Sequence, residues 1–360
     1  MAQNARRKLG ESLMNQHHVF TSLGNFWRDY YLLPCWDLSE QPVVYLGEVY
    51  NGYKLKRRLG HWCWLTEHFT IRQYMTLKFL PRSPTGLAEL KINEYIRQKS
   101  RSPYLSIITD HFEIPHHLAS TSAEHKDIKF NVIVYPVTGT DLRRYSSEEG
   151  LVEPLSFSQK TNCIRELVRG LADLHSLGVV HGDIHAGNVA LPAPRATDIA
   201  SFLMKPPVVS EIRRKDGQPM DPILPQRVTE PVDIGFGEGI TKILDFGYAF
   251  IPQDGISYTK DSFACGTPAP PELVLDGAST KFPFQVDSWC LGLAIYFILT
   301  DGQDLLISLG LPMNRNNCLI STNNSLNSGT TRMSTFKAFL PSSSGFCSVS
   351  CSRIPSADCP

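Results

Sequence analysis

Apolar and polar residues alternate in short runs between residues 52 and 138. Such alternation places the apolar side chains on one face of an extended chain, which is typical of β-strands. A helical segment at residues 87–98 interrupts the runs. The expected strands are at residues 53–55, 74–80, 106–108 and 131–135.

Residues 139–310 are predicted to be mainly helical. Five apolar residues recur there at i, i+3, i+4, i+7 and i+10: Ile164, Leu167, Val168, Leu171 and Leu174. This spacing puts one apolar stripe on a helix, which Gly178 can end. Residues 289–300 are apolar on every side and predict a buried helix. The whole pattern predicts the α+β fold class.

Composition narrows the class of protein. A length of 360 residues exceeds one ordinary core, so about two domains are expected. Hydrophobic residues make up 42% of the chain, which excludes wholesale disorder. The 35 basic and 35 acidic residues cancel, so no chain-wide field favours nucleic acid or an anionic membrane as a partner. Residues 311–360 contain eleven Ser and six Asn, and we expect a disordered tail at 306–360.

The sequence also lacks targeting and membrane signals. Its longest apolar run, residues 291–299, is too short to cross a bilayer, and no apolar signal region follows Met1. The nine cysteines form no C-x-x-C pair, so neither a zinc site nor a redox motif is indicated. We expect a soluble monomer in a reducing compartment, either the cytoplasm or the nucleus.

The strongest chemical signal is His181-Gly-Asp-Ile-His-Ala-Gly-Asn188, followed by Asp245-Phe-Gly247. The first is predicted to be a loop that aims the Asp183 carboxylate at a substrate hydroxyl and the Asn188 amide at a metal. Asp245 stands at the end of a predicted strand, before a glycine turn. Mg²⁺ takes one or two protein oxygens together with phosphate oxygens, and Asn188 and Asp245 can supply them.

Phosphoryl transfer also requires a cation near the phosphates. Lys78 in a predicted strand is the candidate, and an acid on the following helix should hold it. Glu89 is best placed for that role, with Glu94 second. A lone Asp-Phe-Gly is usually a turn and a lone strand lysine is usually solvated, so the ordered set carries the inference.

This ordered set resembles the signature residues of eukaryotic protein kinases. Gly266-Thr-Pro-Ala-Pro-Pro-Glu272 is similar to their Ala-Pro-Glu segment, and Asp287-Ser-Trp-Cys-Leu-Gly292 matches their Asp-x-Trp-x-x-Gly pattern. Residues 42–60 and 214–231 are similar to the narrower group of SR-protein kinase (SRPK)-like Ser/Thr kinases of fungal type. The resemblance covers about residues 40–305, so we expect a kinase that is truncated at its C-terminal end.

The resemblance implies a two-lobed kinase fold. The N-lobe, residues 51–138, would be small and β-rich with one helix. The C-lobe, residues 139–305, would be larger, mainly helical and interrupted by an insert at 191–240. Residues 1–50 would be an N-terminal extension. The implied activity is transfer of the ATP γ-phosphate to Ser or Thr of a protein, with ATP and Mg²⁺ as cofactors and no direct contact with nucleic acid or membrane.

The resemblance also assigns roles to residues. Asp183 would be the catalytic base, and Lys78 would hold the α/β-phosphates while it pairs with Glu89. Asn188 and Asp245 would bind Mg²⁺. The nucleotide site would further contain Leu59, Gly60, Tyr135 and Val137, with a hinge at 135–138 and Tyr135 at the back of the pocket. His185 would be a catalytic residue in place of the usual lysine, or a structural histidine.

Several positions depart from the family pattern. After Leu59 only Gly60 remains of Gly-x-Gly-x-x-Gly, while Trp62 and Leu65 stand at later glycine positions. Two interpretations are open: bulky side chains that keep the backbone off the phosphates, or a β-hairpin whose aromatics pack on adenine or ribose. Gly182 replaces an arginine, which predicts activity that is independent of phosphorylation at Ser257, Tyr258, Thr259 or Ser262.

Two further departures concern stability. Asn93 stands where the family has an apolar residue, and a buried polar group without a partner is unfavourable. If Glu94 were the partner of Lys78, that objection would move to Gln98. The arginine that pairs with Glu272 in the family is missing, so a kinase less stable than a complete one is expected.

Three classes of function are therefore considered. A protein Ser/Thr kinase is preferred. Residues 191–305 contain fifteen acidic and nine basic residues. This excess of negative charge suits a basic Arg/Ser-rich substrate, but it is equally compatible with an ordinary solvated surface. A pseudokinase that binds ATP or a partner is favoured by the degraded glycine loop. A small-molecule kinase is suggested by the His-Gly-Asp-x-His motif at 181–185.

Overall fold

The computed structural model describes most of the chain between residues 42 and 305. All of its described residues belong to one compact unit, residues 1–319. The predicted tail at 306–360, most of the N-terminal extension and the centre of the insert lie outside the described residues. The described residues are 20–21, 42–60, 62–117, 126–145, 154–211, 213–214, 219, 226–264, 270–273 and 278–305.

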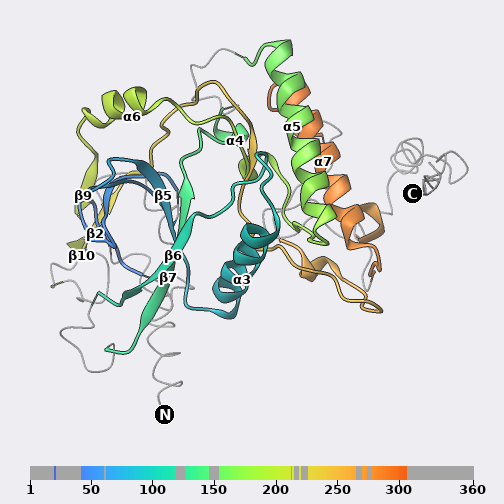
Figure 1. Cartoon of the computed structure of the whole chain (residues 1–360), viewed down its shortest axis with the longest axis horizontal. Helices are drawn as coiled ribbons and strands as arrows, with labels where there is room; N and C mark the ends of the chain where they lie inside the picture. The colour runs from blue at the N-terminus through green and yellow to red at the C-terminus, as the bar shows by residue number, and fades with distance from the viewer. Residues whose placement is uncertain are drawn as a thin grey trace, which may run out of the picture. The chain divides into compact units, whose positions relative to one another are not determined.

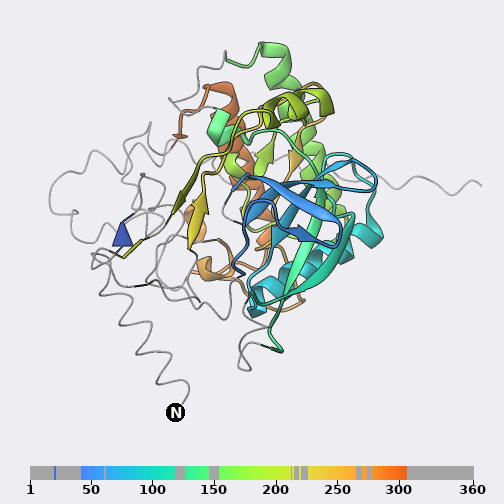
Figure 2. The same ribbon diagram turned by 90° about the vertical axis from the view of Figure 1, so that its left-hand side faces the viewer.

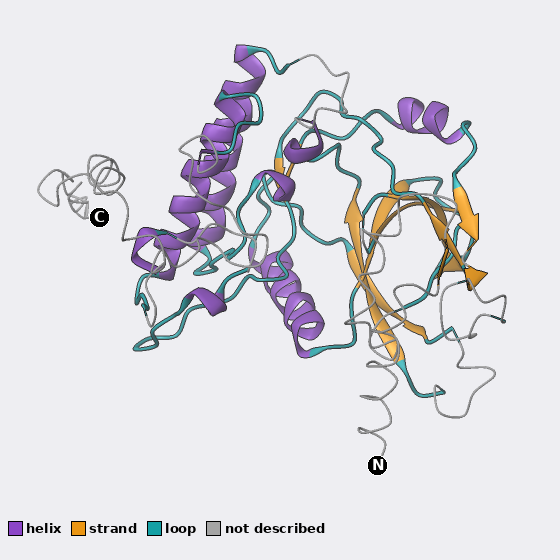
Figure 3. Cartoon of the chain, turned by 180° about the vertical axis from the view of Figure 1, so that it is seen from behind, coloured by secondary structure: helices purple, strands orange, loops and turns teal. Residues whose placement is uncertain are grey.

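A strongly curled antiparallel sheet forms the first half of the described chain (Figures 1 and 3). Its strands follow the order β2-β3-β4-β5-β7-β6. Alternation along β5 turns Leu77 and Phe79 into the sheet core, while Thr76 and Lys78 face the opposite side. The bounds are β2 Val49–Tyr50, β3 Tyr53–Arg58, β4 Cys63–His68, β5 Tyr74–Phe79, β6 Asp110–Pro115 and β7 Lys129–Pro136.

The predicted strands at 53–55, 74–80 and 131–135 are confirmed as parts of β3, β5 and β7. The strand expected at 106–108 is wrong, since β6 begins only at Asp110. Those residues form a loop in which Ile108 is buried and the Ser106 backbone N–H donates to the Ile243 carbonyl. The sheet also includes Val49–Tyr50, which the predicted boundary at residue 51 had left in the N-terminal extension.

Helix α3, Pro84–Lys99, contains the predicted helical segment. The Ser83 side chain caps its first turn by accepting from the Gly86 N–H. On its buried face, Ile92 and Ile96 pack into the core that includes α5, α7 and the loops between them. The other buried residues of that face are polar, Glu89 and Asn93, apart from Gly86 near its start.

Helices α5, Phe157–Ser176, and α7, Pro283–Leu299, lie side by side (Figures 1 and 3). The predicted stripe on α5 is confirmed at Leu167, Leu171 and Leu174, but Val168 is 41% exposed. The prediction that the second helix is buried on every side is wrong, because Leu299 is 52% exposed. Contact with α5 buries one face of α7, where buried residues recur every four positions: Val286, Cys290, Ala294 and Ile298.

Between α5 and α7 the described chain runs mainly in loops, contrary to the expectation of a helical second half. A long insert, which contains the short helix α6, folds back onto the sheet. Figure 2 shows its two strands β9 and β11 as a hairpin beside the sheet. The elements are α4 Leu142–Tyr145, β8 Val189–Ala190, α6 Ala196–Leu203, β9 Val209–Glu211, β11 Arg227–Thr229, β12 Lys242–Ile243, and β10 Arg213–Arg214 paired with β1 Phe20–Thr21.

The insert is fixed to strand β3 by two buried arginines. Arg57 donates to the Leu203 carbonyl at 3.1 Å, at the end of α6, and Arg58 donates to the Thr229 carbonyl at 3.4 Å. The Val232 N–H in turn donates to the Arg58 carbonyl at 2.8 Å. The insert therefore joins the sheet at the end of β3. Across the described ranges, no helix has both the length and the apolarity needed to cross a membrane.

Candidate functional site

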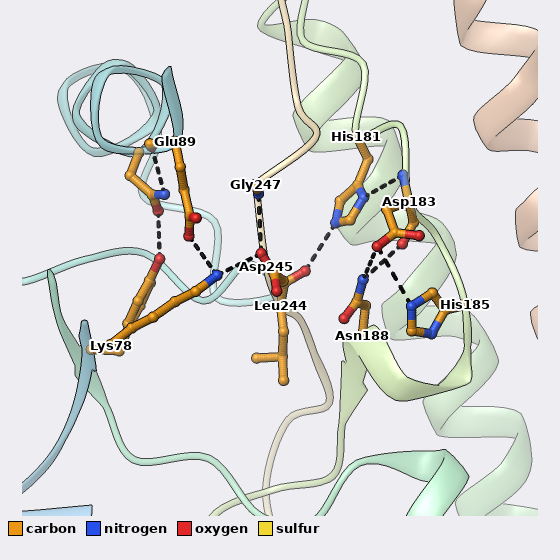
Figure 4. Close-up of polar contacts among 11 residues, drawn as sticks. Lys78, Glu89, His181, Asp183, His185, Asn188, Leu244, Asp245 and Gly247 are labelled. Carbon is orange, nitrogen blue, oxygen red and sulfur yellow. Dashed lines mark hydrogen bonds and ion pairs between the residues drawn. The ribbon is translucent and has the colours of Figure 1, made fainter. Parts of the chain in front are cut away.

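Lys78 lies between two carboxylates at the centre of the site (Figure 4). Its Nζ is 2.6 Å from Glu89 Oε1 and 2.8 Å from Asp245 Oδ1. The lysine comes from β5, Glu89 from α3, and Asp245 from the turn after β12. The prediction that Glu89 is the partner of Lys78 is confirmed. Glu94, the second candidate, instead pairs with Arg97 and His111.

The charges of this group depend on burial and on one another. Burial disfavours the Lys78 ammonium, but Glu89 and then Asp245 outweigh that effect and hold its pKa well above its usual value. Burial raises the pKa of the Glu89 carboxyl, although Lys78 opposes this. For Asp245, burial is the largest single influence and raises the pKa, but the Lys78 charge together with the hydrogen bonds from Lys78 and the Gly247 N–H outweighs it, so the pKa is lowered. These pKa shifts make Lys78 a cation and Asp245 an ionised carboxylate.

Asp245 is held in an uncommon backbone conformation. Its φ is +58°, a region that residues other than glycine seldom adopt. The Asp245 Oδ1 accepts from the Gly247 N–H at 3.1 Å, and the preceding Leu244 N–H donates to the Asn188 carbonyl at 2.8 Å. The strained turn thus brings the Asp245 carboxylate next to the loop that carries Asn188. Strain of this kind concentrates at functional sites.

Asn188 and Asp183 are joined by the Asn188 amide. Its Nδ2 donates to the Asp183 carbonyl at 2.9 Å and to Asp183 Oδ2 at 3.0 Å. Because the amide nitrogen is turned toward Asp183, the amide oxygen lies on the opposite side of the group. Asn188 lines the same cavity as Asp245, so its oxygen is available there as a hard ligand.

The loop that carries Asp183 is fixed by Asp287 of α7. Asp287 is 1% exposed and accepts from the backbone N–H of His181 at 2.7 Å and of Gly182 at 2.9 Å. It also pairs with His175 Nε2 at 2.9 Å. Asp287, the first residue of the Asp-x-Trp-x-x-Gly pattern, therefore fixes the backbone of the candidate loop. His181 adds a second tie, since its Nε2 lies 2.9 Å from the Leu244 carbonyl.

His185 lies beside the Asp183 carboxylate. Its Nδ1 accepts from the Gly187 N–H at 2.9 Å, which leaves Nε2 as the protonated nitrogen of the neutral ring. That Nε2 is 3.6 Å from Asp183 Oδ2. The histidine therefore orients a hydrogen toward the carboxylate that was predicted to act as a base.

Gly182 occupies a backbone conformation that restricts its side chain. Its φ is +76°, and a Cβ atom built there would lie 2.7 Å from the Tyr248 carbonyl oxygen. An arginine at this position would therefore require the 248 segment to move. The departure from the family pattern has a local steric reason.

A cavity of about 330 Å³ adjoins these groups. Two residues predicted for the nucleotide site do not line it: Val137, although its neighbours Pro136 and Thr138 do, and Glu89, which contacts the lining residue Lys78. The other predicted nucleotide-site residues line the cavity: Leu59, Gly60, Lys78, Tyr135 and Asp245. Asp183 and His185 are not lining residues either, but Asp183 contacts the lining residue Asn188. The lining residues are Leu59, Gly60, Cys63, Thr76, Lys78, Ser106, Tyr135, Pro136, Thr138, Gly139, Thr140, Asp141, Arg144, Gly187, Asn188, Val232, Asp233, Ile234, Leu244 and Asp245.

The connection between β3 and β4 above the cavity is short. Only four residues, 59–62, separate the strands, and the Leu59 and Gly60 N–H groups both donate to the Cys63 carbonyl, at 2.8 and 3.3 Å. The connection is a β-hairpin, as one of the two interpretations expected, but Trp64 is 2% exposed in the sheet core and does not line the cavity. The packing of aromatics on adenine or ribose stays a prediction. Leu65 is likewise buried in β4.

One wall of the cavity was not predicted from the sequence. Val232, Asp233 and Ile234, at the end of the insert, line it. The Thr140 hydroxyl donates to Asp233 Oδ2 at 2.6 Å, and the Thr140 N–H donates to the Gly235 carbonyl at 3.0 Å. No local periodicity marks these residues, since their position depends on how the insert returns to the sheet.

The buried Asn93 is satisfied, so the cost expected for it is absent. Its Nδ2 donates to the Glu89 carbonyl at 2.9 Å, and its Oδ1 accepts from the Tyr135 hydroxyl at 3.0 Å. The segment 265–269 of the Ala-Pro-Glu motif lies outside the described residues, and the side chain of Glu272 does too.

Asn188 and Asp245 fit a Mg²⁺ ion that also binds phosphates, and they are too few to bind a metal ion with protein ligands alone. Among the described residues, no cluster of three or more His, Cys, Asp or Glu side chains forms a metal site. Asp245 and Asn188 offer one carboxylate and one amide oxygen at the cavity, which suits an ion that shares its coordination with phosphates. No protein-family model matches the chain, and no curated protein sequence matches it either. The chemistry of the site is therefore inferred from its own residues.

Proposed function

We propose that the chain is an ATP- and Mg²⁺-dependent protein serine/threonine kinase with a two-lobed kinase fold of the SRPK-like type. One observation carries the proposal: Lys78, Asn188 and Asp245 come from three separate segments and line one cavity, and the Asn188 amide holds the Asp183 carboxylate beside it. Their order along the chain is the order that the resemblance requires. The cavity volume of about 330 Å³ is in the range of small-ligand sites.

Each residue has a distinct task in this proposal. Lys78, kept cationic by Glu89, binds phosphate oxygens of ATP. Mg²⁺, held by Asn188 and Asp245 when bound, neutralises charge on the phosphates. Asp183 accepts the proton of the substrate hydroxyl, and its carboxylate is oriented by the Asn188 amide. General-base help of this kind contributes roughly 10²–10⁴-fold to the rate.

The proposed substrate is Ser or Thr of a protein, with an Arg/Ser-rich segment as the preferred class. The excess of acidic residues in 191–305, fifteen against nine basic residues, supports a basic substrate. The proposed kinase works as a monomer in the cytoplasm or nucleus and does not bind nucleic acid or membrane.

A second candidate is a pseudokinase that binds nucleotide without efficient transfer. The four-residue connection between β3 and β4 favours it, because so short a turn supplies few backbone N–H groups to phosphates. Intact Lys78, Asp183, Asn188 and Asp245 favour the kinase.

The test is Mg²⁺-dependent transfer of labelled γ-phosphate from ATP to three acceptors. An Arg/Ser peptide, a neutral Ser peptide and choline are offered in parallel. Label on a peptide, with the Arg/Ser peptide preferred, is expected. Label on choline would favour a small-molecule kinase, and folded protein that labels none of the acceptors would favour the pseudokinase.

A further inference from the structure

The buried face of α3 makes two polar contacts with the sheet. Glu89 contacts Lys78 on β5 (Figure 4), and Asn93, one turn later, contacts Tyr135 on β7. Residues four apart lie on the same face of a helix, so both contacts point the same way. Tyr135 and Thr76 are register partners across β7 and β5, two residues from Lys78.

The orientation of Asn93 is fixed from both sides. Its Nδ2 donates to the Glu89 carbonyl at 2.9 Å, so its Oδ1 must be the atom that meets Tyr135. The Tyr135 hydroxyl donates to that oxygen at 3.0 Å. Asn93 is 1% and Tyr135 7% exposed, so water does not compete for either group.

Apolar packing gives α3 little hold on the sheet. Ile92 and Ile96 pack into the core of α5 and α7, and the main sheet core contains no residue of α3. On the sheet side, Leu90 packs against a small cluster of Leu80, Ile108, Ile133 and Tyr135. Apolar contacts are non-directional, so they do not set the rotation of the helix. A hydrogen bond of defined geometry does.

We propose that the hydrogen bond between Tyr135 and Asn93 positions α3 so that Glu89 stays on Lys78. Tyr135 and Asn93 are thus positioning residues, and their importance for phosphate transfer rests on the proposed function. The contact itself does not, because the Lys78–Glu89 pair can be followed without nucleotide. Loss of the tyrosine hydroxyl is expected to let the helix turn and to separate Glu89 from Lys78 part of the time, which leaves Asp245 as the carboxylate beside the lysine.

The experiment follows the acetylation of Lys78 in the full chain. An amine is acylated only when it is deprotonated, so a lysine held in an ion pair reacts slowly. The chain is treated with an N-hydroxysuccinimide acetate ester, without ATP, and the rate at Lys78 is read by mass spectrometry. Glu89→Gln sets the upper limit of the rate. Tyr135→Phe and Asn93→Ala, each alone and together, test the contact.

Tyr95→Phe is the matched control. Tyr95 is also on α3, and its hydroxyl donates to the Leu177 carbonyl at 3.1 Å, away from the sheet. Both Tyr→Phe variants lose one buried or partly buried hydrogen bond of the same helix. Only Tyr135→Phe is expected to raise the Lys78 rate, by roughly threefold to tenfold.

The double variant separates a shared contact from two independent effects. If Tyr135 and Asn93 act through one hydrogen bond, the double variant reacts about as fast as either single variant. The inference is overturned if the rate factors multiply, or if both single variants match the parent while Glu89→Gln reacts faster. Should Tyr135→Phe fail to fold, the comparison of Asn93→Ala with Tyr95→Phe decides. The acetylation rate of Lys78 does not depend on phosphate transfer, so this inference and the proposed function can fail separately.

Discussion

Lys78 Nζ lies 2.8 Å from Asp245 Oδ1, so the lysine holds one oxygen of the carboxylate that is proposed to bind metal. The two roles of Asp245 are therefore in competition. In the proposed complex with Mg²⁺ and ATP, phosphate oxygens would replace Asp245 as the partner of Lys78, and the lysine and the metal would together neutralise the phosphates.

The metal role predicts the behaviour of Asp245→Asn. Asparagine tolerates the φ of +58°, so the fold should be kept. Mg²⁺ should then no longer strengthen ATP binding, because the charged ligand is gone. Calorimetry with and without Mg²⁺ measures this, with Asp261→Asn in an exposed turn as the control. An equal gain from Mg²⁺ in Asp245→Asn and in the parent would exclude Asp245 as a ligand.

Because the insert forms one wall of the cavity, we expect it to slow the release of bound nucleotide. Thr140→Val removes the hydroxyl that bonds Asp233 at 2.6 Å and should loosen the cavity wall at 232–234. We expect a fluorescent ADP analogue to dissociate roughly threefold to tenfold faster, as measured by stopped flow. Thr109→Val is the control, because its hydroxyl bonds the Val134 carbonyl and neither residue lines the cavity. Equal rates in both variants would show that the wall does not limit exchange.

Two glycines with nearly the same φ separate strain from steric contact. A Cβ at Gly178, φ +74°, meets no atom within 4 Å, whereas a Cβ at Gly182, φ +76°, lies 2.7 Å from the Tyr248 carbonyl oxygen. Gly178→Ala should lower the free energy of unfolding by about 1–2 kcal/mol. Gly182→Ala should lower it by about 1–3 kcal/mol more. Urea unfolding tests this, and similar losses in the two variants would show that the Tyr248 carbonyl moves away freely.

Cys63 reports on the cavity through its pH dependence. Burial, with Asp245 and Glu89 adding to it against Lys78, raises its pKa to about 11. Its alkylation by iodoacetamide should therefore rise about tenfold per pH unit from pH 8 to pH 10, because only the thiolate reacts. ATP should slow the reaction at Cys63 and leave Cys163 unchanged, since the pKa of Cys163 is also about 11 but its thiol lies in the helical core. Equal protection of both thiols would indicate general stabilisation of the fold.

Local pattern predicted the elements that carry the site. Alternation along residues 74–80 identifies a strand, and it also puts Lys78 on the face away from the sheet core. The sequence also preferred Glu89 on the next helix as the partner of Lys78, with Glu94 second, and the structure has Glu89 there. The strand and the helix could be predicted because each depends on neighbours within one strand or one turn.

Contacts between distant segments could not be predicted in this way. Tyr135 and Asn93 are 42 residues apart, and their meeting depends on the curl of the sheet and the placement of α3. Asp233 and Thr140 are 93 residues apart, and they meet where the insert, bonded to Arg57 and Arg58, returns to the sheet. The strand expected at 106–108 failed for a related reason, since its apolar residues are buried by tertiary contacts that a loop also permits.

The most direct test of the central claim compares γ-phosphate transfer by the parent chain and by Asp183→Asn. The substitution keeps the size of the side chain but removes the carboxylate that is proposed to accept the proton. ATP affinity, measured on the same preparations, should change little. The account predicts transfer to an Arg/Ser peptide by the parent and a rate lower by about 10²–10⁴-fold in Asp183→Asn. Equal rates in the two proteins, or a folded, ATP-bound parent that transfers nothing, would contradict it.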